Sequence, residues 1–218
     1  MVMQYHLVAF VILLVAVIAV FAFRSSTDDS QVQEDFDRFL NEPMSPRQAV
    51  RFYERYVGHK YENQGYDVSY LAGLKGHVDQ GRDIIVKTPK EILVIQTRAF
   101  GRRRVVHDND IYQLFGKMTH FKLTSVDPNR TTRAIFYSTS NFSSLAKQAA
   151  STLGVEIRTE KFNRTYPMIK CSVSPTGEKN YYLPFDPVYD RVKIDHKRDE
   201  HFVRTVHQAV KKGFKRAG

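Results

Sequence analysis

Cysteine is nearly absent from this sequence, since the 218 residues contain only Cys171. A single thiol forms no internal disulfide and cannot provide the sulfur ligands of a multi-cysteine zinc site. The fold must therefore be held by packing, and Cys171 is expected to be a small apolar residue of the core. A composition of 42% hydrophobic and 26% charged residues is typical of a folded protein.

Charged residues are missing from Leu7 to Phe23, where all 17 residues are Leu, Val, Ala, Phe or Ile. A helix rises about 1.5 Å per residue, so this run is near the short end of what crosses the roughly 30 Å hydrocarbon core of a bilayer. We predict a single transmembrane helix within residues 1–24, with the basic soluble part on the cytoplasmic side. A cleaved signal peptide is the alternative, although no basic region precedes the run. The polar, acidic residues 25–45 are interpreted as a tether with a short helical piece.

Acidic residues are too few to balance the basic ones, and the formal net charge is +10 at pH 7. Between Arg191 and Gly218, nine Lys or Arg stand against three Asp or Glu. A positive field of this kind favours a polyanionic partner, either nucleic acid or anionic lipid head groups. Lys211 and Lys212 in this segment are candidate nucleic-acid contacts.

Two apolar runs separated by a turn lie near the middle of the chain. Asp83 precedes the first run, residues 84–86, and the second run, residues 92–95, leads into Gln96, Thr97 and Arg98. This pattern predicts a β-hairpin. Because strand side chains alternate between faces, Gln96 and Arg98 share one face, and Asp83 can lie close to them. An acid, an amide oxygen and a cation on one rim could hold a hard cation and a phosphate. The alternative is a surface hairpin with polar ends.

The same segment, GHVDQGRDIIVKTPKEILVIQTR from Gly76 to Arg98, resembles the Mrr-type branch of the PD-(D/E)xK restriction-endonuclease superfamily. That pattern is approximately D-x-G-x-D, a hairpin turn and Q-x-K. Asp79, Gly81, Asp83 and Gln96 match it, whereas Arg98 stands where the family has lysine.

The resemblance extends over about residues 46–157, with the family's order of helices and strands. It implies an α/β fold, a restriction-endonuclease-like sandwich with a mixed central sheet flanked by helices. Ser45 and Pro46 are a helix-start signal, and apolar spacing predicts that this first helix continues to about Asn63. A further helix is predicted from Asp108 to Lys122.

The resemblance also implies roles for individual residues. Asp83 and Glu54, the latter at the place of the family's helix carboxylate, would hold Mg²⁺ or Mn²⁺ with help from Gln96. The basic residue at position 98 would orient the attacking water and offset charge on the phosphorane. Arginine stays protonated in proteins, so Arg98 can serve only if the family's lysine supplies charge rather than moving a proton. From the residues alone, Glu54 is equally explained as a salt-bridging helix residue.

A cationic loop follows the hairpin, with Arg102, Arg103 and Arg104. Such a run is usually a solvated turn, but beside a metal and phosphate site it is where a nucleic-acid backbone would pass. Gln113, on the predicted helix from Asp108, is expected to face the same site.

From residue 167 onward the sequence resembles a small module found after bacterial nuclease domains. It has a hairpin with the pattern G-E-K-x-Y-x-x-P, an expected strand from Tyr189 to Ile194, and a short helix near the C-terminus. The chain is thereby divided into four parts: a transmembrane anchor (1–24), a polar tether (25–45), an Mrr-like nuclease domain (46–166) and a small basic C-terminal module (167–218).

The leading interpretation is a membrane-anchored, metal-dependent DNA endonuclease that hydrolyses phosphodiester bonds, either alone or as a homodimer. One alternative is a catalytically inactive nuclease-fold protein that binds DNA or acidic lipid at the membrane. Another is an adaptor that binds a protein or lipid through its C-terminal module.

Overall fold

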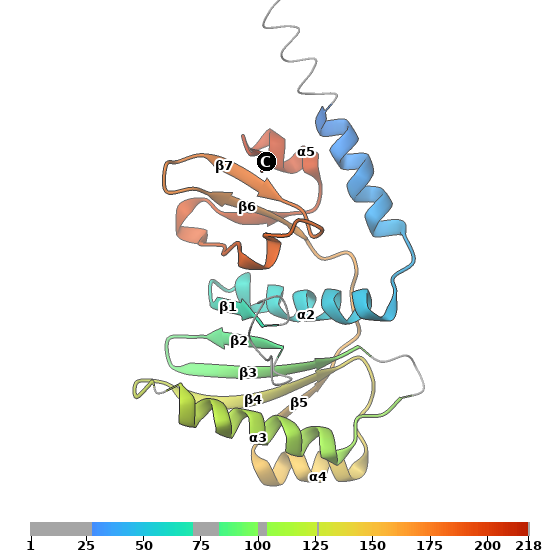
Figure 1. Ribbon diagram of the computed structural model, residues 1–218, viewed down its shortest axis with the longest axis vertical. Coiled ribbons are helices and arrows are strands. Elements are labelled where there is room, and N and C mark those ends of the chain that lie inside the picture. The colour runs from blue at the N-terminus through green and yellow to red at the C-terminus, as the bar shows by residue number, and fades with distance from the viewer. Residues whose placement is uncertain (1–27, 72–82, 100–103, 126, 218) are drawn as a thin grey trace, which may run out of the picture.

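The computed structural model describes residues 28–71, 83–99, 104–125 and 127–217 (Figure 1). Within these ranges no helix has both the length and the apolar character needed to cross a bilayer. The predicted transmembrane helix, residues 1–24, lies outside the described residues, and so do Asp79 and Gly81 of the family pattern.

A five-stranded mixed sheet forms the larger part of the molecule, with the spatial order β1-β2-β3-β4-β5. The first three strands pair antiparallel, and β3, β4 and β5 pair parallel. The predicted hairpin is confirmed, because Ile84 lies opposite Ile95 and Lys87 opposite Ile92. The strands are β1 (Asp67–Tyr70), β2 (Ile84–Lys87), β3 (Glu91–Arg98), β4 (Thr131–Ser138) and β5 (Glu156–Thr159).

Helices cover both faces of this sheet, as expected for the sandwich. Helix α2 (Pro46–Glu62) packs Tyr53 and Val57 against one face, and helices α3 (Asp108–Thr124) and α4 (Ser144–Leu153) cover the other. The Ser45 hydroxyl accepts a hydrogen bond from the Gln48 amide (3.3 Å), and the Gln48 side chain accepts one from the Ser45 amide (2.8 Å). This reciprocal cap confirms the predicted start of α2.

The C-terminal module has its own four-stranded sheet, ordered β8-β6-β7-β9, with helix α5 packed on it. Cys171 is fully buried there, as predicted. The strand expected from Tyr189 to Ile194 is wrong. Residues 189–191 form a 3₁₀ turn in which the Arg191 amide donates to Val188 O (2.9 Å), because Pro187 favours a tight turn over a strand. The elements are β6 (Ile169–Val173), β7 (Lys179–Tyr182), η1 (Tyr189–Arg191), η2 (His196–Arg198), β8 (His201–Val203), α5 (Val206–Lys211) and β9 (Lys215–Arg216).

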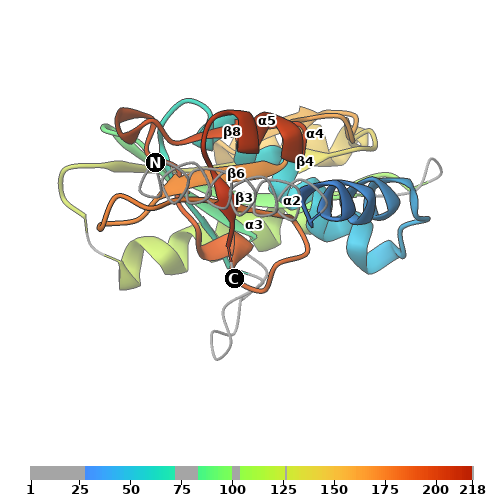
Figure 2. The same ribbon diagram turned by 90° about the horizontal axis from the view of Figure 1, so that it is seen from above.

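Helix α2 lies between the two sheets (Figure 1), and the view from above shows the module in front of the five-stranded sheet (Figure 2). Phe52 of α2 is part of the module's apolar core. The segment interpreted as a tether is largely a helix over residues 28–41, and its Phe36, only 1% exposed, packs into the same core. Two distant parts of the sequence therefore complete the module.

Candidate functional site

Asp83 is fixed against the end of β3 by hydrogen bonds. Its backbone amide donates to Ile95 O (3.1 Å). Its carboxylate Oδ2 accepts from both the amide (2.5 Å) and the hydroxyl (3.2 Å) of Thr97. Asp83 thus lies beside the Gln96 to Arg98 segment, in the arrangement that the hairpin predicted.

Asp83 is also almost completely buried, at 8% exposure. Burial raises the pKa of its carboxyl, although the Thr97 hydrogen bonds and the charges of Arg98 and Lys117 partly oppose this. The carboxyl is held in one orientation at a site where a positive charge is favourable.

Glu54 projects from α2 and is 6% exposed. Burial, followed by repulsion from Asp83, raises the pKa of Glu54 to about 8, and the charges of Arg51 and Arg55 only partly offset this rise. Within the described ranges, the Glu54 carboxyl makes no hydrogen bond or ion pair. The alternative interpretation of Glu54 as a salt-bridging helix residue is therefore not supported by the described contacts.

Gln96 is completely buried on the face of β3 that α3 covers. Its Oε1 accepts a hydrogen bond from Lys117 Nζ (3.4 Å), while its Nε2 has no partner among the described residues.

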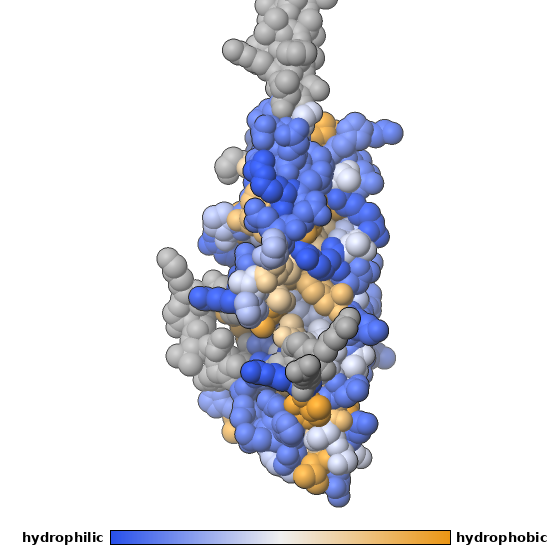
Figure 3. Space-filling model, turned by 90° about the vertical axis from the view of Figure 1, so that its right-hand side faces the viewer, coloured by the Kyte–Doolittle hydropathy of each residue, from blue (hydrophilic) through white to orange (hydrophobic). Residues whose placement is uncertain are grey.

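Arg98 is partly buried at the end of β3, where its Nη1 donates to Thr97 O (3.3 Å). Its charge acts on Asp83. Asp83, Gln96, Arg98 and the carboxyl of Glu54 are therefore brought to one end of the sheet. This end faces the viewer in Figure 3, where an apolar strip crosses a largely hydrophilic surface.

Lys117 of α3 belongs to the same group, and sequence reasoning did not identify it. It contacts Gln96 Oε1 and acts electrostatically on Asp83. Gln113, which was expected to face the site, is exposed and lies one helical turn before Lys117. The i, i+4 spacing of the two residues was the available signal, because both lie along one side of α3.

The predicted nucleic-acid contacts are placed only in part. Arg104 is exposed where the chain continues toward α3, and Arg102 and Arg103 lie outside the described residues. Lys211 and Lys212 are exposed in the C-terminal module. No hydrogen bond or ion pair found in the described structure joins these two lysines to the carboxylate site.

The donor set at the sheet end fits a hard divalent cation. In the part of the chain that the structure describes, no group of three or more His, Cys, Asp or Glu side chains is arranged to hold a metal ion by itself. Mg²⁺, however, needs only one or two carboxylates and retains several waters. The site has two buried carboxyls, Asp83 and Glu54, and the charge of Asp83 raises the pKa of Glu54. Together with the buried amide of Gln96 they meet this requirement, so these three residues are the candidate ligands.

Two carboxylates and one amide at the end of a mixed sheet with helices on both faces place the protein in the α/β class. A family model described as restriction endonuclease matches residues 47–161. Because the match covers more than half of the chain, the protein belongs to this restriction endonuclease family.

Several solved structures are similar to the chain. A protein of unknown function, AF1548, is 14% identical with a TM-score of 0.41, over 50% of this chain and 56% of that one. A repair endonuclease from Pyrococcus abyssi is 15% identical with a TM-score of 0.38, over 56% and 49%. The MspJI restriction endonuclease in complex with a 27-mer oligonucleotide is 9% identical with a TM-score of 0.36, over 62% and 28%. The chain thus spans about half the length of the first two structures. No curated protein matches the sequence.

Proposed function

We propose that this protein is a metal-dependent endonuclease that hydrolyses phosphodiester bonds in DNA. One observation carries the proposal: the buried carboxyl of Glu54 lies within the electrostatic reach of Asp83, at the end of the sheet where β3 also carries the buried amide of Gln96, in a domain of the restriction endonuclease family. Two acids kept near each other and away from water are unfavourable unless a cation joins them.

Asp83, Glu54 and Gln96 would hold Mg²⁺ or Mn²⁺, which when bound polarises the phosphate and lowers the pKa of a water. Arg98 stays protonated, so its role is to bind a phosphate oxygen and to offset negative charge. The Thr97 hydrogen bonds keep Asp83 in place, and the packing of α2 keeps Glu54 directed inward.

Lys117 provides a basic group that can accept a proton, which Arg98 cannot provide. Its ammonium group lies 3.4 Å from Gln96 Oε1, inside the same cluster. A lysine in a partly buried site can lose its proton, whereas an arginine cannot. Lys117 is therefore the basic side chain of this site that can orient a water and accept its proton.

DNA would be held by the basic residues near the site and in the module. Arg102, Arg103 and Arg104 follow β3 in the sequence, Gln113 lies on α3, and Lys211 and Lys212 are exposed in the basic module. Their affinity for phosphates comes largely from the release of counterions, so binding should weaken steeply as salt is added. Residues 1–24 would anchor this nuclease in the membrane, with the soluble part in the cytoplasm.

A cleavage assay tests the proposal. The 218-residue chain is incubated with supercoiled plasmid and Mg²⁺ or Mn²⁺, beside Asp83→Asn and the control Asp67→Asn. Asp67 also belongs to the five-stranded sheet, but it is exposed and pairs with Lys193 (2.8 Å). Nicking is expected for the wild type and for Asp67→Asn, and not for Asp83→Asn or in EDTA. Linearisation would in addition indicate that two copies cut together, as the predicted homodimer would.

A catalytically inactive DNA-binding protein is the second candidate, and one contact favours it. The Lys117 ammonium already lies on Gln96 Oε1, so the protein has a cation of its own beside the expected metal ligands. A gel shift of plasmid DNA that weakens with salt, without any cleavage in Mg²⁺ or Mn²⁺, would support this candidate over the nuclease.

A further inference from the structure

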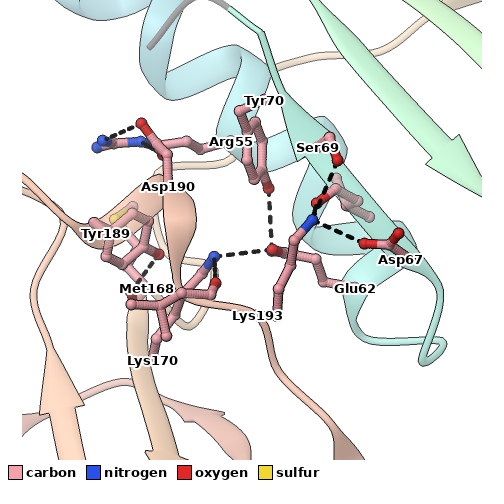
Figure 4. Close-up of polar contacts among 12 residues, drawn as sticks. Arg55, Glu62, Asp67, Ser69, Tyr70, Met168, Lys170, Tyr189, Asp190 and Lys193 are labelled. Atoms are coloured by element: carbon pink, nitrogen blue, oxygen red, sulfur yellow. Dashed lines mark hydrogen bonds and ion pairs between the residues drawn. The ribbon is translucent and has the colours of Figure 1, made fainter. Parts of the chain in front are cut away.

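Asp190 of the C-terminal module binds two arginines of α2. Arg55 reaches it with two hydrogen bonds, Nε to Oδ1 (2.7 Å) and Nη2 to Oδ2 (3.0 Å). Arg51 Nη2 also contacts Asp190 Oδ2. Figure 4 shows Arg55 and Asp190 within a network of polar contacts between α2 and the module.

The contact between Arg55 and Asp190 is largely buried. Arg55 is 7% exposed, its Nη1 donates to Pro184 O (2.6 Å), and its guanidinium carbon lies 4.7 Å from the centre of the Tyr189 ring. Burial opposes ionisation of Asp190, but the hydrogen bonds and charge of Arg55 outweigh it and hold the pKa of Asp190 below its usual value. Asp190 is therefore a fixed negative charge.

Both arginines are close to Glu54 along α2. Arg51 lies three residues before Glu54, a spacing that places two side chains on the same side of a helix, where opposite charges attract. Arg55 is the next residue. Both cations act on Glu54 electrostatically, yet its carboxyl is paired with neither of them. The guanidinium groups are directed to Asp190 instead.

We propose that Asp190 is a positioning residue of the nuclease site: by holding Arg51 and Arg55 on the module side of α2, it leaves the Glu54 carboxylate open to a divalent cation. This inference rests on the proposed metal-dependent function. Without the charge of Asp190, Arg51 would turn to Glu54 and form an intrahelical ion pair where the cation should bind.

The remaining contacts in Figure 4 hold the module in the position that this role requires. Lys170, 1% exposed, donates to Glu62 Oε1 (2.9 Å), and the Tyr70 hydroxyl donates to Glu62 Oε2 (3.0 Å). Lys193 pairs with Asp67 of β1 (2.8 Å). The module is thus attached to the end of α2 and to the edge of the sheet, and Asp190 meets α2 about two to three turns before Glu62.

Mn²⁺ binding tests the inference without depending on cleavage. Free Mn²⁺ is measured by electron paramagnetic resonance in titrations of the 218-residue chain. Asp190→Asn is expected to weaken Mn²⁺ binding about tenfold. Adding Arg51→Gln to Asp190→Asn should restore most of the affinity, because the competing cation is then gone.

Asp186→Asn is the matched control. Asp186 is also in the module, pairs with an arginine (Arg216), and has the same side-chain exposure as Asp190, 11%. It should bind Mn²⁺ as the wild type does. Unchanged Mn²⁺ binding by folded Asp190→Asn would overturn the inference, and so would a loss that Arg51→Gln does not restore. Neither result affects the proposed function as long as the wild type binds Mn²⁺ and cuts DNA. A wild type that does neither overturns both.

Crystals of the wild-type protein grown without metal, and the same crystals soaked in Mn²⁺, cover the case in which Asp190→Asn does not fold. Arg51 and Arg55 are expected on Asp190 in both states. A metal-free crystal with either guanidinium on Glu54 would overturn the inference.

Discussion

Glu54 and Asp83 are acids that the fold holds close together with little access to water, and the charge of Asp83 disfavours ionisation of Glu54. The consequence at the level of single residues is a stability that depends on pH. For Glu54 the pKa rises from 4.5 to about 8 on folding. Between these values the folded protein keeps a proton that the unfolded chain has lost, so the free energy of unfolding falls as pH rises through this range and is level above it.

Glu54→Gln should remove this loss. In EDTA at pH 9 the variant is expected to be more stable than the wild type by about 2 kcal/mol, with a much smaller difference at pH 5. Urea unfolding at a series of pH values measures it, with exposed Glu178→Gln as the control. If the plots of unfolding free energy against pH for Glu54→Gln and the wild type run parallel across this range, folding does not raise the pKa of Glu54.

Lys117 and Arg98 make separable contributions. Lys117→Met is expected to lower the rate of plasmid cleavage by about a hundredfold, the lower end of what a proton-transferring group contributes. DNA binding in a gel shift should be kept. Lys122→Met, which changes an exposed lysine of the same helix, should cleave normally. Full activity in Lys117→Met together with none in Arg98→Met would assign the basic role to Arg98 instead.

The sequence predicted part of this residue-scale picture. Strand alternation correctly placed Gln96 and Arg98 at one sheet end with Asp83, because that relation is local. Lys117 contacts Gln96 across 21 positions, and Asp190 contacts Arg55 across 135. A short-range sequence pattern cannot predict such contacts, since they depend on how α3 packs on the sheet and how the module packs on α2.

Helix α2 is the element on which the molecule depends, because it packs against one sheet with Tyr53 and Val57 and against the other with Phe52. Its boundaries could be read from Ser45, Pro46 and the apolar spacing. Its second packing surface could not be predicted, because an amphipathic pattern indicates only one buried face. Arg55 in particular would be assigned to the solvent-exposed face unless its partner in the module were known. The expected strand at Tyr189 failed for a related reason, since the turn that replaces it carries Asp190 to α2.

Gly58 of α2 lies directly against Tyr70 of β1. A Cβ there would overlap the hydroxyl and ring of Tyr70. Tyr70 is buried and donates to Glu62, so it cannot move freely. Gly58→Ala is therefore expected to destabilise the protein by about 2–3 kcal/mol in urea unfolding.

Gly116 of α3 is the matched control, because nothing lies within 4 Å of a Cβ built on it. Gly116→Ala should stabilise the protein by about 0.5–1 kcal/mol, the usual gain of alanine over glycine inside a helix. Equal effects of the two substitutions would contradict the close packing of α2 on β1.

For the whole molecule, the contact between nuclease domain and module is a buried charged interface. Lys170 and Glu62 are 1% and 4% exposed, and the Lys170 ammonium also donates to Val192 O (2.9 Å). Removing one member of a buried ion pair leaves the charge of the other without a partner. Lys170→Met should therefore lower the free energy of unfolding by about 3–5 kcal/mol.

The two units should also unfold in a single calorimetric transition, in the wild type and in Lys170→Met alike. Lys193→Gln breaks an ion pair whose side chains are 49% and 54% exposed, and it should lower the free energy of unfolding by less than about 1 kcal/mol. Two resolved transitions in the wild type would show that the module folds independently of α2.

The burial of α2 between two sheets also bears on truncated forms of the protein. A nonsense codon between β5 and β6 would deprive Phe52 and Arg55 of the surface that covers them, and it would release Arg51 toward Glu54. The shortened product would keep every residue of the D-x-G-x-D and Q-x-R pattern and still be expected to aggregate or be degraded. Alleles of that kind should behave as nulls in a genetic screen, although every codon of the proposed site is intact.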